Sequence, residues 1–105
     1  MELKIFWTDF SQKELEKIFE YYKENVGLKV ALRLINGILD KSLKLKKQPK
    51  IGQIEELLKN RKEKFRYLIF KNYKIIYWIN ENKKQVEIID IFDVRQNPLK
   101  IKRTL

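Results

Sequence analysis

The sequence predicts an α+β domain that consists of an N-terminal strand, an antiparallel helix hairpin and a three-stranded antiparallel β-meander, with both helices on one face of the sheet. Three observations predict this fold. Residues 2–8 alternate in character as a strand does, residues 11–45 place apolar side chains at three- and four-residue spacing, and residues 66–94 are rich in β-branched and aromatic side chains. The length of 105 residues fits a single domain, 1–105.

The first helix is predicted to begin at a capping box. Ser11 is followed three residues later by Glu14, and Asp9 just ahead favours the positive end of a helix. The helix then runs to about residue 25, where Gly27 stops it. The strand before it has one apolar face, formed by Leu3, Ile5 and Trp7.

A second helix follows after so short a turn that the two helices must pack as an antiparallel hairpin. Leu43 and Leu45 extend its apolar pattern before Pro49 ends it, and residues 49–52 then form a turn. Residues 53–64 fit either a short helix or an ordered, largely exposed loop. The apolar positions of the second helix begin with Val30, Ala31, Leu34, Ile35, Ile38 and Leu39.

The last third of the chain predicts three strands, at 66–70, 73–80 and 85–94. The residues between them have the length of hairpin turns. The middle run is apolar on both faces, with Ile75 on one side and Ile76 on the other, so it predicts a central strand. Because the two helices cover only one face of the sheet, the other face is expected to be partly open.

The positive charge is confined to the second part of the chain. Lys and Arg number 24 against 14 Asp and Glu, which gives a net charge of +10. Residues 1–40 hold six basic and seven acidic side chains, so the whole excess lies in residues 41–105. A one-sided positive field attracts phosphate backbones or an acidic protein partner, although basic surfaces also serve solubility.

Several kinds of chemistry are excluded by composition. The chain contains no Cys and no His, which removes disulfides, zinc sites of the usual kind, Cys proteases and His-based triads. The three glycines form no phosphate-binding loop, so no cofactor or metal is expected. No apolar stretch approaches the roughly 20 residues that cross a bilayer, so we expect no membrane association and a cytoplasmic location.

Basic and aromatic side chains are interleaved along the predicted meander, a mixture that binds phosphates and stacks bases. Arg66 and Arg95 each lie in an otherwise apolar stretch, where a charged group needs a partner or an open face. The alternative is structural, because aromatic side chains in strands more often form core or cross-strand pairs. The candidate binding residues are Lys62, Lys64, Arg66, Lys71, Lys74, Tyr77 and Arg95.

No catalytic residue follows from these patterns alone. Asp90 and Asp93 are the best-placed carboxylates for acid–base work, but they point to opposite faces of the predicted last strand. An ion pair between Asp93 and Arg95 is the expected alternative. Arg and Lys can stabilise the charge of a phosphoryl transition state without a His, so a metal-independent nuclease stays open.

Four short motifs follow one another along nearly the whole chain. They are Trp7-Thr8, the hairpin closing at Pro49 with Gly52, the run 66–77 that contains Arg66, Leu68, Tyr73, Lys74, Ile75 and Tyr77, and the closing 92–98. The order of these motifs resembles the RelE/ParE superfamily of bacterial type II toxins, the toxin halves of toxin–antitoxin pairs. In the run 66–77, Asn72 stands where Gly is common in that superfamily, and a left-handed turn tolerates Asn.

The two branches of this superfamily imply different functions. RelE-like members are ribosome-dependent mRNA endonucleases that use a cluster of Arg and Lys and often a C-terminal Tyr or His; Arg66, Lys74 and Arg95 would then be catalytic. ParE-like members are described as DNA gyrase inhibitors. The chain has no Tyr or His after Arg95, and its long hairpin and its Arg95-Gln96-Asn97-Pro98 ending resemble ParE.

The resemblance therefore implies a ParE-like toxin that arrests growth by binding DNA gyrase rather than by an enzymatic reaction. A RelE-like nuclease acting on the ribosome and mRNA is the alternative, and a non-toxic nucleic-acid-binding module is a further one. The expected partner is a cognate antitoxin with an acidic or amphipathic tail that forms a hetero-oligomer with the toxin. The groove between the helix hairpin and the sheet edge is the candidate site for that tail.

Overall fold

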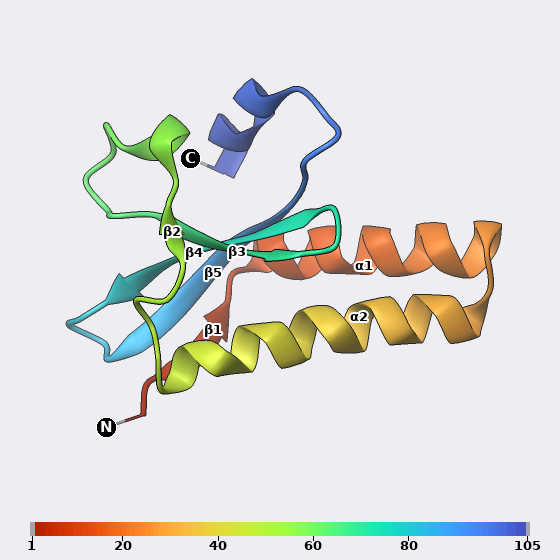
Figure 1. The fold of residues 1–105 in the computed structure, drawn as a ribbon, viewed down its shortest axis with the longest axis horizontal. Coiled ribbons are helices and arrows are strands. Elements are labelled where there is room, and N and C mark those ends of the chain that lie inside the picture. The colour runs from red at the N-terminus through yellow and green to blue at the C-terminus, as the bar shows by residue number, and fades with distance from the viewer. Residues whose placement is uncertain (1, 105) are drawn as a thin grey trace.

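The computed structural model describes residues 2–104 and confirms the α+β fold (Figure 1). A strand and two long helices are followed by the remaining strands, with three short 3₁₀ segments between or after them. The elements are β1 (Lys4–Trp7), α1 (Asp9–Asn25), α2 (Leu28–Leu43), η1 (Lys44–Lys46), β2 (Gln53–Ile54), η2 (Glu56–Leu58), β3 (Arg66–Phe70), β4 (Tyr73–Asn80), β5 (Gln85–Asp93) and η3 (Pro98–Thr104).

The sheet is mixed and has five strands in the order β1-β5-β4-β3-β2. The predicted meander forms its centre, where β3, β4 and β5 pair antiparallel and β4 is the central strand. β1 pairs parallel with β5. The helix hairpin carries the chain from β1 to β2 at the opposite edge of the sheet, and the antiparallel strands β3, β4 and β5 then lead back to β1. The two-residue strand β2 forms the opposite edge.

The first helix begins earlier than the sequence predicted. Its N-cap is Thr8, whose hydroxyl oxygen accepts a hydrogen bond from the Ser11 amide at 3.1 Å. Ser11 is buried, and its own hydroxyl donates to the Thr8 carbonyl at 2.8 Å. The predicted Ser11 and Glu14 capping box is therefore wrong: Ser11 is already inside the first turn, and Glu14 forms ion pairs elsewhere.

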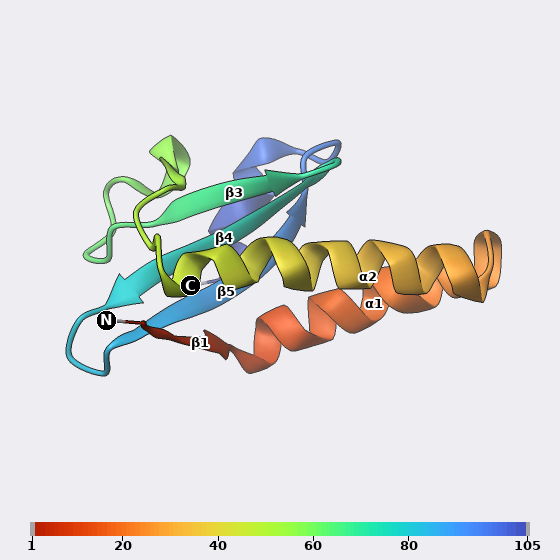
Figure 2. The same cartoon turned by 60° about the horizontal axis from the view of Figure 1, so that its bottom comes forward.

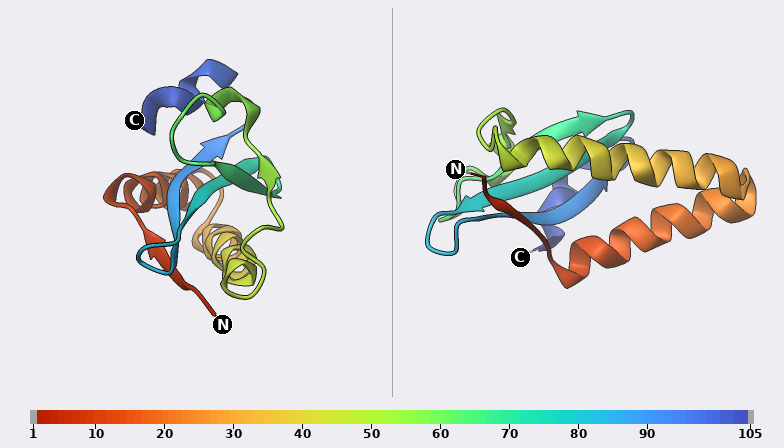
Figure 3. Two further views of the ribbon diagram at one scale, coloured as in Figure 1. Left: turned by 90° about the vertical axis from the view of Figure 1, so that its left-hand side faces the viewer. Right: turned by 90° about the horizontal axis from the view of Figure 1, so that it is seen from below.

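The two faces of the sheet carry separate cores. The larger core lies between the sheet and the helices, and a smaller one lies on the opposite face, where η2 and η3 cover the sheet (Figures 1 and 3). The sequence did not predict this second cover: Leu58 from η2 and Ile101 from η3 are almost fully buried in it. The other buried members of the second core are Phe65, Ile76, Ile89 and Phe92.

The helix hairpin extends well beyond the sheet (Figure 2). At its tip the apolar side chains have no sheet to pack against, and Val26 and Leu28 are 59% and 52% exposed.

Between residues 2 and 104, no helix is both long enough and apolar enough to span a membrane.

A register shift in β4 and β5 decides where the acidic side chains of β5 point. Ile76 pairs with Asp90 and Tyr77 pairs with Ile88, which leaves Ile89 without a partner as in a β-bulge. Asp90 consequently shares the face of the second core with Ile76. Asp93 pairs with Tyr73, which belongs to the first core, so the prediction that the two aspartates lie on opposite faces is confirmed.

Candidate target and partner surfaces

Tyr77 and Arg66 hold the turn that follows the helix hairpin. The Tyr77 side chain has no exposed surface, and its hydroxyl donates to the Pro49 carbonyl at 2.7 Å and accepts from the Gly52 amide at 3.0 Å. Arg66, opposite Tyr77 in the sheet, donates to the Gly52 carbonyl at 2.9 Å. Burial raises the pKa of Tyr77. Tyr77 was predicted to bind a target, but in this structure it is inaccessible to one.

Lys74 forms a largely buried ion pair. Its ammonium lies 2.6 Å from the carboxylate of Glu55, whose side chain is only 3% exposed. The same ammonium stands 4.2 Å from the centroid of the Tyr67 ring, a cation–π contact. Glu55 also accepts from the Leu57 amide and so caps η2. The charge of Lys74 is thus compensated inside the chain.

Arg95 is the exposed member of the predicted pair with Asp93, and this pair is confirmed. Its Nε and Nη2 donate to the two carboxylate oxygens of Asp93 at 3.0 and 2.7 Å. The hydrogen bonds from Arg95, together with one from Asn72, lower the pKa of Asp93 to about 2. Arg95 borders a pocket of about 430 Å³ that Tyr22 and Tyr73 also line, between α1 and the end of β5.

The three cations proposed for a nuclease do not converge on one site. Arg66 lies opposite Tyr77 on the face of the first core, whereas Lys74 lies opposite Phe92 on the face of the second core. Arg95 follows the end of β5. The remaining candidates are exposed and separate: Lys62 and Lys64 precede β3, and Lys71 lies in the β3–β4 turn with a φ of 53°.

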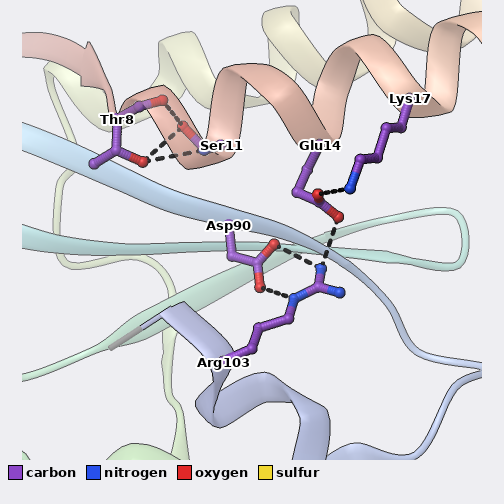
Figure 4. A network of polar contacts seen from close by, with 6 residues as sticks. All are labelled: Thr8, Ser11, Glu14, Lys17, Asp90 and Arg103. Carbon is purple, nitrogen blue, oxygen red and sulfur yellow. Dashed lines mark hydrogen bonds and ion pairs between the residues drawn. The ribbon is translucent and has the colours of Figure 1, made fainter.

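A polar network that the sequence did not predict joins both ends of the chain (Figure 4). Arg103 in η3 donates to the two oxygens of Asp90 at 3.0 and 3.2 Å, and to Glu14 in α1 at 3.0 Å. Glu14 also pairs with Lys17. Asp90 is fully buried, and this burial raises its pKa although the hydrogen bonds from Arg103 act in the opposite direction. The available signal was an aspartate inside the apolar run 88–92.

A groove does run between the helix hairpin and the β1 edge of the sheet. It consists of three hollows of about 450, 580 and 470 Å³, which we call the β1 groove. Neighbouring hollows share residues: the first two share Ile5, Trp7 and Leu39, and the last two share Leu43 and Lys46. The groove is therefore continuous from the start of α1 to η1.

No metal centre is visible in the part of the chain that the structure describes, because no three Asp or Glu side chains gather there in a way that could hold an ion. The surface features described above are exposed cations, a pocket lined in part by tyrosines, and an apolar groove. Such a set suits recognition of another macromolecule.

Comparison with known proteins identifies the family. A sequence model described as "ParE toxin of type II toxin-antitoxin system, parDE" matches residues 5–98. This match covers most of the chain, so the chain belongs to the ParE toxin family of type II toxin–antitoxin systems. A search of curated protein sequences finds no match.

Solved structures of related toxins share the fold. A structure titled "Chromosomal ParDE TA system from P. aeruginosa" matches with a TM-score of 0.73 and 18% identity over 89% of this chain and 97% of the other. The RelBE2 toxin–antitoxin complex of Mycobacterium tuberculosis matches with a TM-score of 0.64 and 14% identity, over 89% of this chain and 92% of the other. A mutant of the E. coli toxin RelE in the free state matches with a TM-score of 0.63 and 15% identity, over the full length of both chains.

Proposed function

We propose that this protein arrests bacterial growth by binding DNA gyrase, and that a cognate antitoxin neutralises it. The observation that carries the proposal is the match of nearly the whole chain to the ParE toxin family. An antitoxin partner is supported by the related structures, two of which are titled as toxin–antitoxin systems or complexes. We propose the cytoplasm as the place of action.

The arrangement of the cations supports inhibition by binding over cleavage of mRNA. A RelE-like reaction would need several cations around one phosphate. Here Arg66 binds backbone carbonyls and Lys74 binds Glu55, on opposite faces of the sheet. Of the three cations proposed for a nuclease, Arg95 is the one that is largely exposed, with 65% of its side chain accessible.

Expression of the chain in bacteria tests the toxin claim. We expect growth to stop on induction, and a neighbouring gene to encode a small protein with a DNA-binding N-terminal domain and an acidic tail whose co-expression restores growth. Normal growth at high levels of soluble, folded protein would contradict the proposal.

A translation extract separates the two targets. Transcripts should remain intact when purified protein is added, whereas a nuclease would cut them and the Arg95→Ala variant would not. If the wild-type protein cleaves the transcripts and the Arg95→Ala variant does not, the result contradicts the gyrase proposal and favours the RelE-like reaction.

A further inference from the structure

We propose that the pocket between α1 and the end of β5 binds a nucleotide, with its phosphate on Arg95 and Lys17 and its base against Tyr21. We call this the α1–β5 pocket, and its volume of about 430 Å³ lies in the usual range for small-molecule sites. Among the described residues, none that lines it also lines the β1 groove, so the two are separate surfaces. The proposal depends neither on gyrase nor on an antitoxin.

One side of α1 forms the first wall of the pocket. Glu14, Lys17, Ile18, Tyr21 and Tyr22 line it, and their three- and four-residue spacing puts all of them on the same side of a helix. The helix hairpin extends beyond the sheet (Figure 2), so the later turns of this side are not covered by strands. The wall therefore presents two tyrosines and a lysine to solvent.

The end of the sheet forms the floor and the opposite wall. The amide of Val94 donates to the Asn72 carbonyl at 2.9 Å, which fixes the chain where it leaves β5. Tyr73 and Ile91 lie beneath this point and are almost fully buried in the first core. Burial, together with the neighbouring Tyr22, raises the pKa of Tyr73, so its hydroxyl brings no negative charge to the floor. A flat ring fits such a floor.

The open side of the pocket presents cations rather than carboxylates. The side chains of Lys17 and Arg95 are 75% and 65% exposed, whereas those of their partners Glu14 and Asp93 are only 12% and 28% exposed. Glu14 is also held by Arg103 (Figure 4). A ligand that enters from solvent therefore meets positive charge first, and the net charge of +10 of the chain adds to this attraction.

Arg95 keeps part of its guanidinium available for a phosphate. Its Nε and Nη2 donate to Asp93, whereas Nη1 has no hydrogen-bond partner among residues 2–104. The edge formed by Nη1 and the second N–H of Nη2 has the fork geometry that binds two phosphate oxygens at once. Asp93 fixes the orientation of this fork, so a phosphate meets a cation that is already positioned.

Tyr21 provides the place for a base. It is 59% exposed, and its ring stands edge-on to that of Tyr22, with the centroids 5.3 Å apart and the planes at 81°. This contact orients an accessible aromatic ring, on which nucleobases stack. The amide of Gln96, next to Arg95, offers donors and an acceptor to the polar edge of a base.

Other ligand classes fit the pocket less well. A cationic ligand would have to take Glu14 or Asp93 from its present partner. A purely apolar ligand would cover charged groups without giving them a counter-charge. A ring joined to a phosphate satisfies the floor and the cations together, and a nucleoside monophosphate is such a molecule.

A titration followed by amide chemical shifts in NMR tests the ligand class. The probes are adenosine monophosphate, adenosine, inorganic phosphate and phenyl phosphate. Adenosine monophosphate should give saturable shifts at Lys17, Tyr21, Arg95 and Gln96, and it should bind about tenfold tighter than adenosine or phosphate alone. Absence of saturable shifts at the pocket overturns the proposal. Equal affinity for phenyl phosphate and adenosine monophosphate overturns the assignment to a nucleotide.

Matched variants locate the binding on the cations. Arg95→Gln should weaken the binding of adenosine monophosphate about tenfold, whereas Arg33→Gln, at an exposed arginine of α2 outside the pocket, should leave it unchanged. Lys17→Gln should weaken it about threefold, whereas Lys13→Gln, at an exposed lysine one turn earlier in α1, should not. Equal effects within either pair contradict the proposal.

Two variants of one residue test the stacking. Tyr21→Ala should weaken the binding of adenosine monophosphate about tenfold, because the aromatic ring is lost. Tyr21→Phe keeps the ring and should retain most of the affinity. Full binding by Tyr21→Ala would contradict the place given to the base.

Oligonucleotides distinguish a free nucleotide from the end of a strand. Thymidine monophosphate is compared with short oligothymidines that carry or lack a 5′-phosphate. Pocket shifts with the mononucleotide alone indicate a free nucleotide, and shifts that the phosphorylated oligothymidine also produces indicate a strand end; both support the site. Shifts confined to the lysines at 59–64, equal for both oligothymidines and absent with the mononucleotide, overturn it. Growth and supercoiling enter none of these measurements, so they succeed or fail separately from the proposed function.

Discussion

Arg103, near the end of the described chain, forms two hydrogen bonds to the buried carboxylate of Asp90, at 3.0 and 3.2 Å. The same guanidinium reaches Glu14 in α1, so it ties η3 to both the sheet and the first helix (Figure 4). This contact holds η3 over the second core, in which Ile101 is buried. The C-terminal segment is thereby part of the fold.

Arg103→Met should destabilise the protein, because it leaves the fully buried Asp90 without its cation. A loss of about 2 kcal/mol at pH 7 is expected, below the usual range for a fully buried pair, since 29% of the Arg103 side chain is exposed. Urea unfolding of the variant and of Arg33→Met, which removes an exposed cation from α2, measures the difference. Equal stabilities would contradict a structural role for this pair.

The destabilisation by Arg103→Met should shrink as pH falls. Burial raises the pKa of Asp90, and in the wild type Arg103 acts in the opposite direction. Without Arg103 the folded pKa of Asp90 rises further, so the folded variant takes up this proton at a higher pH than the wild type and regains stability relative to it as pH falls. Unfolding free energies of wild type and variant between pH 7 and pH 4 test this. A constant difference over that range would show that Asp90 does not carry the effect.

Asp93 should titrate at about pH 2, because Arg95 stabilises its charged form. A depressed carboxyl pKa stabilises the folded state above the unfolded pKa, and this contribution is lost as pH falls toward 2. Carboxyl chemical shifts followed by NMR measure the pKa directly. Arg95→Ala should return the pKa toward its usual range, and an unchanged value in that variant would refute the assigned cause.

Tyr77→Phe should cost about 2 kcal/mol of unfolding free energy, since it leaves the buried Gly52 amide and the partly buried Pro49 carbonyl without their partner. Tyr67→Phe is the matched control, because the Tyr67 hydroxyl bonds to Gln53 at an exposed position. Its loss should be much smaller. Similar losses for the two variants in urea unfolding would show that the turn does not depend on Tyr77.

Gly52→Ala should destabilise the same turn. A Cβ at this position would lie 2.5 Å from the Tyr77 hydroxyl and 2.8 Å from the Tyr67 backbone carbonyl oxygen. Both distances are shorter than a van der Waals contact, so these groups would have to shift at a cost in free energy. We expect a loss of about 2 kcal/mol from this overpacking. Gly27→Ala is unsuitable as a control because the φ of Gly27 is 146°, so Asn36→Ala on α2 serves instead. A stable Gly52→Ala protein would contradict the close approach.

Long elements could be predicted from the sequence and short ones could not. The helix hairpin and the strands of the meander span many residues, so their periodicity is clear. β2 has two residues and η2 three, too few for a period to show. The pairing of β1 with β5 joins residues about 80 apart in the chain, a contact that local pattern does not determine.

The same reasoning explains what was missed at the candidate sites. The Asp93–Arg95 pair could be predicted because its members are two residues apart. Arg66 was correctly predicted to need a partner or an open face, whereas Lys74 and Tyr77 were predicted only to bind a target. Their partners, however, come from residues 49–55, a stretch without a clear pattern, so internal bonds could not be distinguished from target binding.

Inhibition of gyrase supercoiling by the purified chain tests the central claim most directly. Relaxed plasmid, gyrase and ATP are combined with increasing amounts of the protein, with and without its antitoxin, and topoisomers are resolved on a gel. The account predicts that supercoiling falls as the protein is added and returns when the antitoxin is present. Full supercoiling at a large molar excess of folded protein would contradict it.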